Sequence, residues 1–379
     1  MNRTFKGTSM LSRAHHFAVA ALTSTVLSFP ALAVQIEVVA TGLAHPWAVA
    51  FVGEGQMLVT ERAGRLRLVD ANGSISGPLT GLPAIAAQRQ GGLLDVVTDR
   101  DFARNRTIYF CYSRPDPTQA GFNSTALAAA RLSDDAKALE NVRDLFVQSP
   151  SYRGGFHFGC RIVQGPDGKL WMGLGDRYQL MQEAQNTANE IGKVVRINQD
   201  GSIPADNPFA GKSGASAAVW SYGHRNIQGA TLDSEGRLWM TEHGPQGGDE
   251  LNLIQPGLNY GWPVITYGEN YGGGQIGDGI TEAPGMQQPA VHWTPSIAPS
   301  GLAFVDSDRY GQAWKGNLML GSLKFGNLVR VALEGDRVVD QEVLLPELRQ
   351  RVRDVRLGPD GFLYILTDSP NGQLIRLKP

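Results

Sequence analysis

Apolar and polar positions repeat along this chain as one unit that recurs six times. In each copy an apolar run leads into a turn containing glycine or aspartate, a second apolar run follows, and a polar corner ends the unit. The apolar residues alternate at the two-residue period of a β-strand. The pattern predicts six hairpins, over residues 47–64, 92–114, 161–177, 228–245, 301–324 and 352–369.

The turns at the centres of these units carry residues that tight hairpins require. Tips such as Pro166-Asp167-Gly168 and Ser234-Glu235-Gly236 supply the necessary backbone freedom. Apolar positions show a helical period in few places, best near residues 183–192. The sequence therefore predicts an all-β fold in which residues 34–379 form a six-bladed β-propeller with four-stranded antiparallel blades. Two stacked β-sandwiches would not explain the repeated hairpin.

The spacing of the six units exceeds what a plain four-stranded blade needs. The distance between the starts of successive units runs from about 45 to about 73 residues. We therefore expect loop insertions on one face of the disc, at residues 115–155, 178–220 and 246–299.

Residues 1–33 have a different composition from the rest of the chain. Three basic and no acidic residues precede an apolar run over 17–32, and Ala31-Leu32-Ala33 places small residues at a cleavage position. This arrangement is typical of a bacterial export signal and predicts a periplasmic protein. The alternative is a membrane anchor, but hydroxyl residues and Pro30 interrupt a run that is already short for a ~30 Å bilayer core.

Charge and cysteine content narrow the functional classes. Removal of residues 1–33 changes the formal charge from −2 to −5, which disfavours a nucleic-acid partner. No later apolar run is long enough to span a membrane. Cys111 and Cys160 are the only cysteines, so a c-type haem motif and a paired-cysteine metal site are excluded. Both lie in apolar segments, where a disulfide and two free buried thiols remain open alternatives.

Polar clusters recur at one place in the unit, just before its first strand or just after its second. Such corners face the central channel of a propeller. In chain order they read HFGCRI, GHRNIQG, EHGPQGGDE, NYGWP, SLK and RVRDVRLGPDG. These motifs, spread over nearly all of residues 34–379, resemble the glucose/sorbosone dehydrogenase family, and within it the periplasmic aldose sugar dehydrogenases. The resemblance implies an enzyme that oxidises the C1 hydroxyl of aldoses to lactones with pyrroloquinoline quinone (PQQ) and Ca²⁺.

The cations at these corners suit a cofactor that carries three carboxylates. Arg351 and Arg353 stand two apart, so both point to one face of a strand. Arginine pairs with carboxylate through two parallel hydrogen bonds, whereas a single surface arginine is more often an ordinary ion pair. By resemblance, the residues that line PQQ are Gln90, His157, Arg225, Asn226, Tyr271, Ser322, Lys324, Arg351 and Arg353.

His157 is the candidate general base. Oxidation at C1 requires removal of the hydroxyl proton while hydride leaves the carbon, and histidine titrates near the working pH. Asp176, after the second strand of the same unit, is expected to hold the imidazole in one tautomer. His224 and His243 also lie at corners, but the resemblance assigns the base to His157. Arg225 is expected to stabilise charge on the quinone as it is reduced.

Calcium is the metal that the oxygen donors favour, since no cluster of Cys or His is present. The resemblance assigns the backbone carbonyls of Gly244 and Pro245 to a Ca²⁺ that also contacts PQQ. Glu250 and the carbonyl of Tyr260 suit a second, structural Ca²⁺. An acidic loop that only faces water is the alternative for Asp249-Glu250.

Two other functional classes remain open, a Ca²⁺-dependent propeller lactonase and a binding propeller without catalysis. A lactonase would not need the cations at Lys324, Arg351 and Arg353. Neither a P-loop nor a dinucleotide fingerprint is present. The expected partners are an aldose substrate and an external quinone or cytochrome that reoxidises PQQ.

Overall fold

The computed structural model describes residues 1–2, 34–53 and 55–379, and all of its helices and strands belong to the compact unit Ala33–Pro379. The predicted export signal at residues 1–33 lies outside the described residues, apart from Met1 and Asn2. Among the described residues, none of the helices has the length and apolar character needed to cross a membrane.

Six antiparallel sheets make up this unit, and five of them have four strands. Within each blade the innermost strand is named first and the outermost last. Blade one is β2 (Pro46–Gly53), β3 (Gln56–Glu61) and β4 (Arg65–Val69); blade two is β5 (Leu93–Thr98), β6 (Thr107–Pro115), β7 (Asn123–Leu132) and β8 (Leu139–Val147); blade three is β9 (Gly159–Gln164), β10 (Leu170–Leu174), β11 (Lys193–Ile197) and β12 (Val219–Tyr222). Blade four is β13 (Ile227–Leu232), β14 (Leu238–Glu242), β15 (Asp249–Ile254) and β16 (Val291–Trp293); blade five is β17 (Pro299–Phe304), β18 (Leu318–Ser322), β19 (Leu328–Glu334) and β20 (Arg337–Leu344); blade six is β21 (Val352–Leu357), β22 (Leu363–Thr367), β23 (Gly372–Lys378) and β1 (Gln35–Leu43).

The predicted hairpins are the two inner strands of each blade. Every first strand contacts the first strand of the next blade, and β21 contacts β2, so the inner strands close a ring. The propeller and its blade count are therefore confirmed. Helical structure is confined to α1 (Phe102–Asn105), η1 (Met181–Gln185), η2 (Asp308–Tyr310) and α2 (Gly311–Trp314) in the described part of the chain. The helical stretch expected near 183–192 is thus a short 3₁₀ helix, η1, which covers only residues 181–185.

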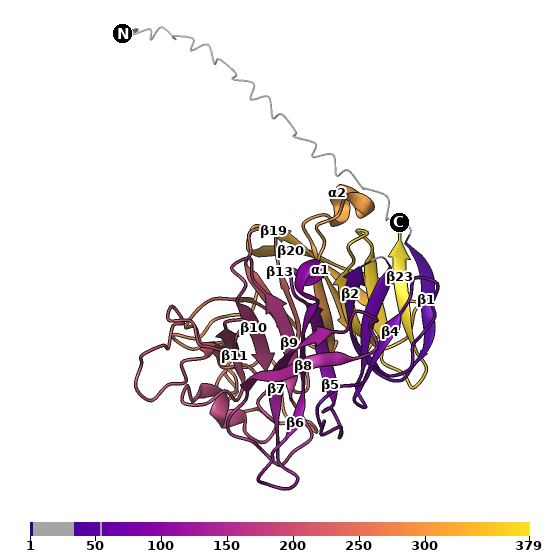
Figure 1. Cartoon of the computed structure of the whole chain (residues 1–379). Coiled ribbons are helices and arrows are strands. Elements are labelled where there is room, and N and C mark those ends of the chain that lie inside the picture. Colours follow the sequence, from indigo (N-terminus) through magenta and orange to yellow (C-terminus); the bar gives the residue numbers. More distant parts are fainter. Residues whose placement is uncertain (3–33, 54) are drawn as a thin grey trace. The chain divides into compact units, whose positions relative to one another are not determined.

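The ends of the unit meet in the last blade. β1 pairs antiparallel with β23, from Gln35 opposite Lys378 to Leu43 opposite Gly372, and Figure 1 shows the indigo strand beside the yellow one. The outer strand of blade six is therefore supplied by the N-terminal side of the unit, which the repeat pattern does not predict.

The expected insertions are in part strands of the blades. Residues 115–155 include β7 and β8, residues 178–220 include β11 and the start of β12, and residues 246–299 include β15 and β16. The three ranges therefore contain outer strands as well as connecting loops. The Ala-rich β7 is buried on both faces, so it lacks the alternation from which strands were recognised.

A disulfide joins blade two to blade three. Cys111 on β6 and Cys160 on β9 are bonded and fully buried, which resolves the alternative left open by the sequence. The bond lies three residues from His157, so it ties the start of β9 to the neighbouring blade.

Four charged side chains fill the axis of the ring and are called the axial charge cluster: Asp95, Arg161, Asp354 and Arg356. Arg161 pairs with Asp354 at 2.7 Å, and Arg356 pairs with Asp95 at 2.5 Å and with Asp354 at 3.1 Å. Arg161 also donates to the backbone carbonyls of Gln228 and Arg353. The cluster connects the inner strands of blades two, three, four and six, and its charges are compensated within the chain.

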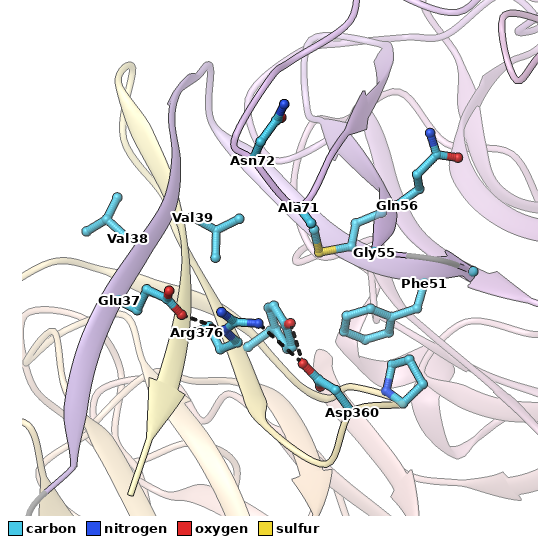
Figure 2. A pocket seen from close by; sticks show the side chains of 14 residues that line it. Glu37, Val38, Val39, Phe51, Gly55, Gln56, Ala71, Asn72, Asp360 and Arg376 are labelled. Carbon is cyan, nitrogen blue, oxygen red and sulfur yellow. Dashed lines mark hydrogen bonds and ion pairs between the residues drawn. The ribbon is translucent and has the colours of Figure 1, made fainter.

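A separate pocket of about 250 Å³ lies where blade six meets blade one (Figure 2). Arg376 there pairs with Glu37 at 2.5 Å and with Asp360 at 3.5 Å, and Phe51 packs edge-on against Tyr364. None of the predicted site residues lines this pocket. Its side chains instead connect the closing strand to its neighbours.

Candidate functional site

Three neighbouring hollows are lined by residues at the polar corners of the blades. These corners lie just before the first strand of a blade or just after its second strand. The first, of about 150 Å³, contains Arg351 and Arg353 and is called the arginine cavity. Two outer hollows of about 260 and 730 Å³ share Pro245 and Tyr271. Of the predicted site residues, the hollows bring together Gln90, Asp176, Arg225, Asn226, Pro245, Tyr271, Lys324, Arg351 and Arg353.

His157 and Asp176 form a buried pair beside these hollows. The imidazole Nδ1 lies 2.6 Å from Oδ1 of Asp176. The backbone N–H of Tyr178 donates to the same carboxylate oxygen, and Nε1–H of Trp262 donates to the other. A carboxylate that already accepts two hydrogen bonds is held in one orientation, and it selects the tautomer in which Nδ1 carries the proton. Nε2 is then left to accept a proton.

The pKa of His157 is lowered from its ordinary value. Burial is the largest cause and the cations of Arg225 and Arg177 add to it, while Asp176 acts in the opposite direction. The imidazole is therefore neutral at neutral pH, which is the form a general base requires.

The backbone of His157 is constrained together with its ring. Its φ is +47°, in the left-handed region that histidine rarely adopts, and its N–H donates to Oε1 of Gln90 at 2.8 Å. Gln90, predicted to line the cofactor, thus also fixes the peptide that carries the candidate base.

Arg351 and Arg353 share one carboxylate, that of Asp368. Arg353 donates to Asp368 at 3.1 Å and to Gln228 at 3.0 Å, while Nε of Arg351 lies 3.8 Å from Asp368. Burial lowers the pKa of Arg353 to about 10, so it remains charged at neutral pH. Asp354, which follows Arg353 in the sequence, pairs with Arg161 and Arg356 instead.

Arg225 spans the gap between the outer hollows and the predicted metal loop. Its guanidinium donates to the carbonyls of His243 and Gly244 and lies 5.3 Å from the ring of Trp262. The Nε–H groups of Arg225 and Arg353 are buried and have no hydrogen-bond partner within the described residues. Buried guanidinium N–H groups left without partners are expected where a ligand supplies the acceptor.

The remaining predicted cofactor residues differ in their surroundings. Lys324 and Tyr271 are exposed and line the larger outer hollow. Oδ1 of Asn226 accepts from the N–H of Gly159 at the edge of the arginine cavity. Ser322 is fully buried, donates to the carbonyl of Ile297 and does not line the three hollows.

The candidate metal residues fall into two places. The carbonyl of Gly244 already accepts from Arg225, while Pro245 lines both outer hollows. Glu250 lies next to Glu242 in blade four, and burial and that neighbouring carboxylate raise the pKa of Glu250 to about 8. Oδ1 of Asn252, whose amide bridges the two acids, is buried without a partner in the described structure. This second place is short of positive charge.

The two other corner histidines have structural surroundings. His224 is fully buried between Ser221 and Glu242. Nε2 of His243 lies 2.7 Å from the carbonyl of Pro299, and burial and Arg353 lower its pKa to about 3.

Comparison with known proteins decides the family. The model of the glucose/sorbosone dehydrogenase family matches residues 43–376. The chain belongs to the glucose/sorbosone dehydrogenase family. It is 44% identical over 362 residues to the aldose sugar dehydrogenase YliI of Escherichia coli (strain K12), an alignment that covers 94% of this chain and 96% of that one.

Solved structures of aldose sugar dehydrogenases have the same fold as this chain. The apo soluble aldose sugar dehydrogenase of Escherichia coli has a TM-score of 0.88 at 42% identity, covering 92% of this chain and all of the other. The PQQ-bound aldose sugar dehydrogenase of Streptomyces coelicolor has a TM-score of 0.74 at 29% identity, covering 92% and 99%. The resemblance recognised in the sequence is confirmed.

Sequence reasoning missed three residues that line the arginine cavity, Arg62, Trp47 and Gln228, and it missed the counterion Asp368. Arg62 and Asp368 directly follow β3 and β22, as Lys324 and His243 follow or nearly follow their second strands. The same position in the repeat therefore signalled them.

Proposed function

We propose that this protein oxidises the C1 hydroxyl of aldose sugars to lactones, with PQQ as cofactor and Ca²⁺ as metal. The observation that carries the proposal is a cavity lined by three arginines and no carboxylate, beside a buried His157–Asp176 pair. A general base and an anion-binding site in one place fit a sugar oxidation that uses an anionic quinone. The names of the relatives support the same activity.

The residues present fit PQQ as a tricarboxylate. Arg225 and Arg353 each keep a buried Nε–H that has no partner among the described residues, and Lys324 and Arg351 are exposed at the rims of the hollows. Guanidinium groups bind carboxylates through charge-assisted hydrogen bonds, which are about twice as strong as neutral ones. These four cations would hold the carboxylates of PQQ.

The chemistry divides between cofactor and protein. PQQ, when bound, would supply an ortho-quinone that accepts hydride from C1 of the sugar. His157 would take the C1 hydroxyl proton at Nε2, while Asp176 keeps Nδ1 protonated and stabilises the imidazolium that results. Arg225 would stabilise negative charge at the oxygens of the cofactor.

Calcium fits both candidate places through oxygen donors. No cluster of three or more His, Cys, Asp or Glu side chains converges within the described part of the chain, so the site would depend on backbone carbonyls such as those of Gly244 and Pro245. The Glu242–Glu250 pair lies beside Oδ1 of Asn252, which has no partner in the part of the chain that the structure describes. This place suits a structural Ca²⁺ that would relieve the repulsion between the two carboxylates.

A spectrum tests the function. Protein reconstituted with PQQ and Ca²⁺ is expected to show quinone absorption that an aldose bleaches, with recovery when an artificial electron acceptor is added. Lactone hydrolysis without bleaching would support a propeller lactonase, and absence of both would support a binding propeller; either result would contradict the dehydrogenase. A panel of aldoses in the same assay would identify the preferred sugar.

Metal dependence is a separate prediction. Exhaustive chelation is expected to abolish sugar oxidation, and Ca²⁺ is expected to restore it better than Mg²⁺, which retains its waters and prefers tight octahedral sites. Turnover should be measured alongside elemental analysis of the stripped protein. Full activity in protein shown to be free of metal would contradict the calcium assignment.

The proposal also includes export of the protein to the periplasm. The composition of residues 1–33 supports a cleaved signal and a periplasmic location, where an external quinone or cytochrome would reoxidise PQQ. Sequencing the N-terminus of the secreted protein tests this directly, with residue 34 expected first.

A further inference from the structure

Arg62 reaches the arginine cavity from blade one, opposite the arginines of blade six. It follows β3 directly and lines the same cavity as Arg351 and Arg353. Gly92 makes room for it, because a Cβ at residue 92 would lie 1.8 Å from the carbonyl oxygen of Arg62 and 2.8 Å from its Cγ. Only glycine at that position allows the Arg62 backbone and side chain to lie where they do.

The arginine cavity has more positive charge than the described residues compensate. Its lining includes three arginines and no carboxylate. The nearest acid, Asp368, pairs with Arg353 and approaches Arg351. Burial alone would raise the pKa of Asp368, but Arg353, His45 and Arg62 outweigh burial and hold it at about 2. One carboxylate therefore faces three guanidinium groups.

Arg62 differs from the structural arginines of the same fold. Arg161 pairs with Asp354, and Arg177 donates to backbone and side-chain oxygens of Asn123. For Arg62, by contrast, no carboxylate within residues 34–53 and 55–379 lies at ion-pair distance, and its guanidinium makes no hydrogen bond to them. A half-buried arginine without a partner, next to two others, favours an anionic ligand.

We infer that Arg62 binds a carboxylate of the cofactor, as a third guanidinium that completes the arginine cavity from the side of blade one. The inference rests on the proposed function, since it assigns Arg62 to the same PQQ site. It also predicts a cost to the apo protein, because three like charges with one counterion repel one another until the anion arrives.

Equilibrium titration of the apo protein with PQQ, beside thermal melting of the same samples, tests the inference. Arg62→Gln is expected to weaken PQQ binding by ~10- to 100-fold, the range for one lost charge-assisted hydrogen bond. Its apo melting temperature should be unchanged or higher, because a like charge is removed. Arg62→Lys should recover part of the affinity, since it keeps the charge and loses the fork.

Arg104→Gln is the matched control, because Arg104 is exposed, pairs with Asp101 alone among the described residues and lies on α1 away from the cavity. It should bind PQQ as the wild type does. If the wild type binds PQQ and Arg62→Gln binds equally well, or if both Arg62 variants lose apo stability while affinity is kept, the inference is overturned and the proposed function stands. If the wild type does not bind PQQ, the proposed function itself fails and the inference fails with it.

Discussion

Replacing His157 by alanine is expected to lower kcat by at least ~10²-fold while PQQ still binds, because general base catalysis typically contributes ~10²- to 10⁴-fold. The imidazole is the group that Asp176 orients and that burial keeps neutral. The cations assigned to PQQ are left in place by this change. Steady-state kinetics with an aldose, together with PQQ titration of the same variant, would measure the two effects separately.

The pH profile gives a second readout of the same group. Because burial and two nearby arginines lower the pKa of His157, its neutral form persists below its usual titration range. The acid limb of kcat/KM should therefore fall below pH ~6.5, the unperturbed value for histidine. His292→Ala is the control, since His292 is exposed on β16 and stacks on Tyr267. Near-normal turnover in His157→Ala would remove it from the mechanism.

Replacing Arg161 by methionine is expected to lower the free energy of unfolding by ~3 to 5 kcal/mol, the range for breaking a buried ion pair from one side. Asp95 and Asp354 would remain fully buried with Arg356 as their one cation. The carbonyls of Gln228 and Arg353 would also lose their donor. Urea unfolding of the apo variant measures the loss.

The loss of unfolding free energy in Arg161→Met should be smaller at lower pH. Burial raises the pKa of Asp95 above its unfolded value, so folding takes up a proton there and stability falls as the pH rises through the folded pKa. The loss in Arg161→Met should therefore shrink in mildly acidic buffer. Arg330→Met is the control, because Arg330 also has two acidic partners, Asp340 and Glu342, but they are solvent-exposed. That change should cost about 1 kcal/mol or less, and an equal loss in both variants would refute a special role for the axial charge cluster.

The sequence predicts the inner hairpins because their signals are local. A turn such as Pro166-Asp167-Gly168 and the alternating residues around it lie within one short segment. The pairing of β1 with β23 has no local signal, because it joins segments at opposite ends of the unit. The Ala-rich β7 lacks the alternation of a strand, because it is buried on both faces. The Cys111–Cys160 bond was undecided for the same reason, because spacing alone does not show which strands are neighbours.

The candidate site could be predicted as a set of corners but not as a set of contacts. Equivalent positions in the repeat must converge on the channel, so His157, Asp176 and Arg353 were found from sequence. Counterions are set by geometry across blades, and the sequence therefore does not identify Asp368 as the partner of Arg353. Ser322 fits the corner pattern, but its hydroxyl donates to the carbonyl of Ile297 and accepts from the N–H of Phe325.

The pairing of Gln35 with Lys378 also sets the order of events in folding. The entropy of closing a loop grows only slowly with its length, so joining the ends of the unit is thermodynamically acceptable. It cannot happen, however, until the last strand has been synthesised. A chain that stops before β23 would leave β1 without a sheet and the edge of β22 unpaired, and unpaired edges invite association with other chains. The ring of blades can therefore close only after the C-terminal strand β23 has been made and has paired with β1.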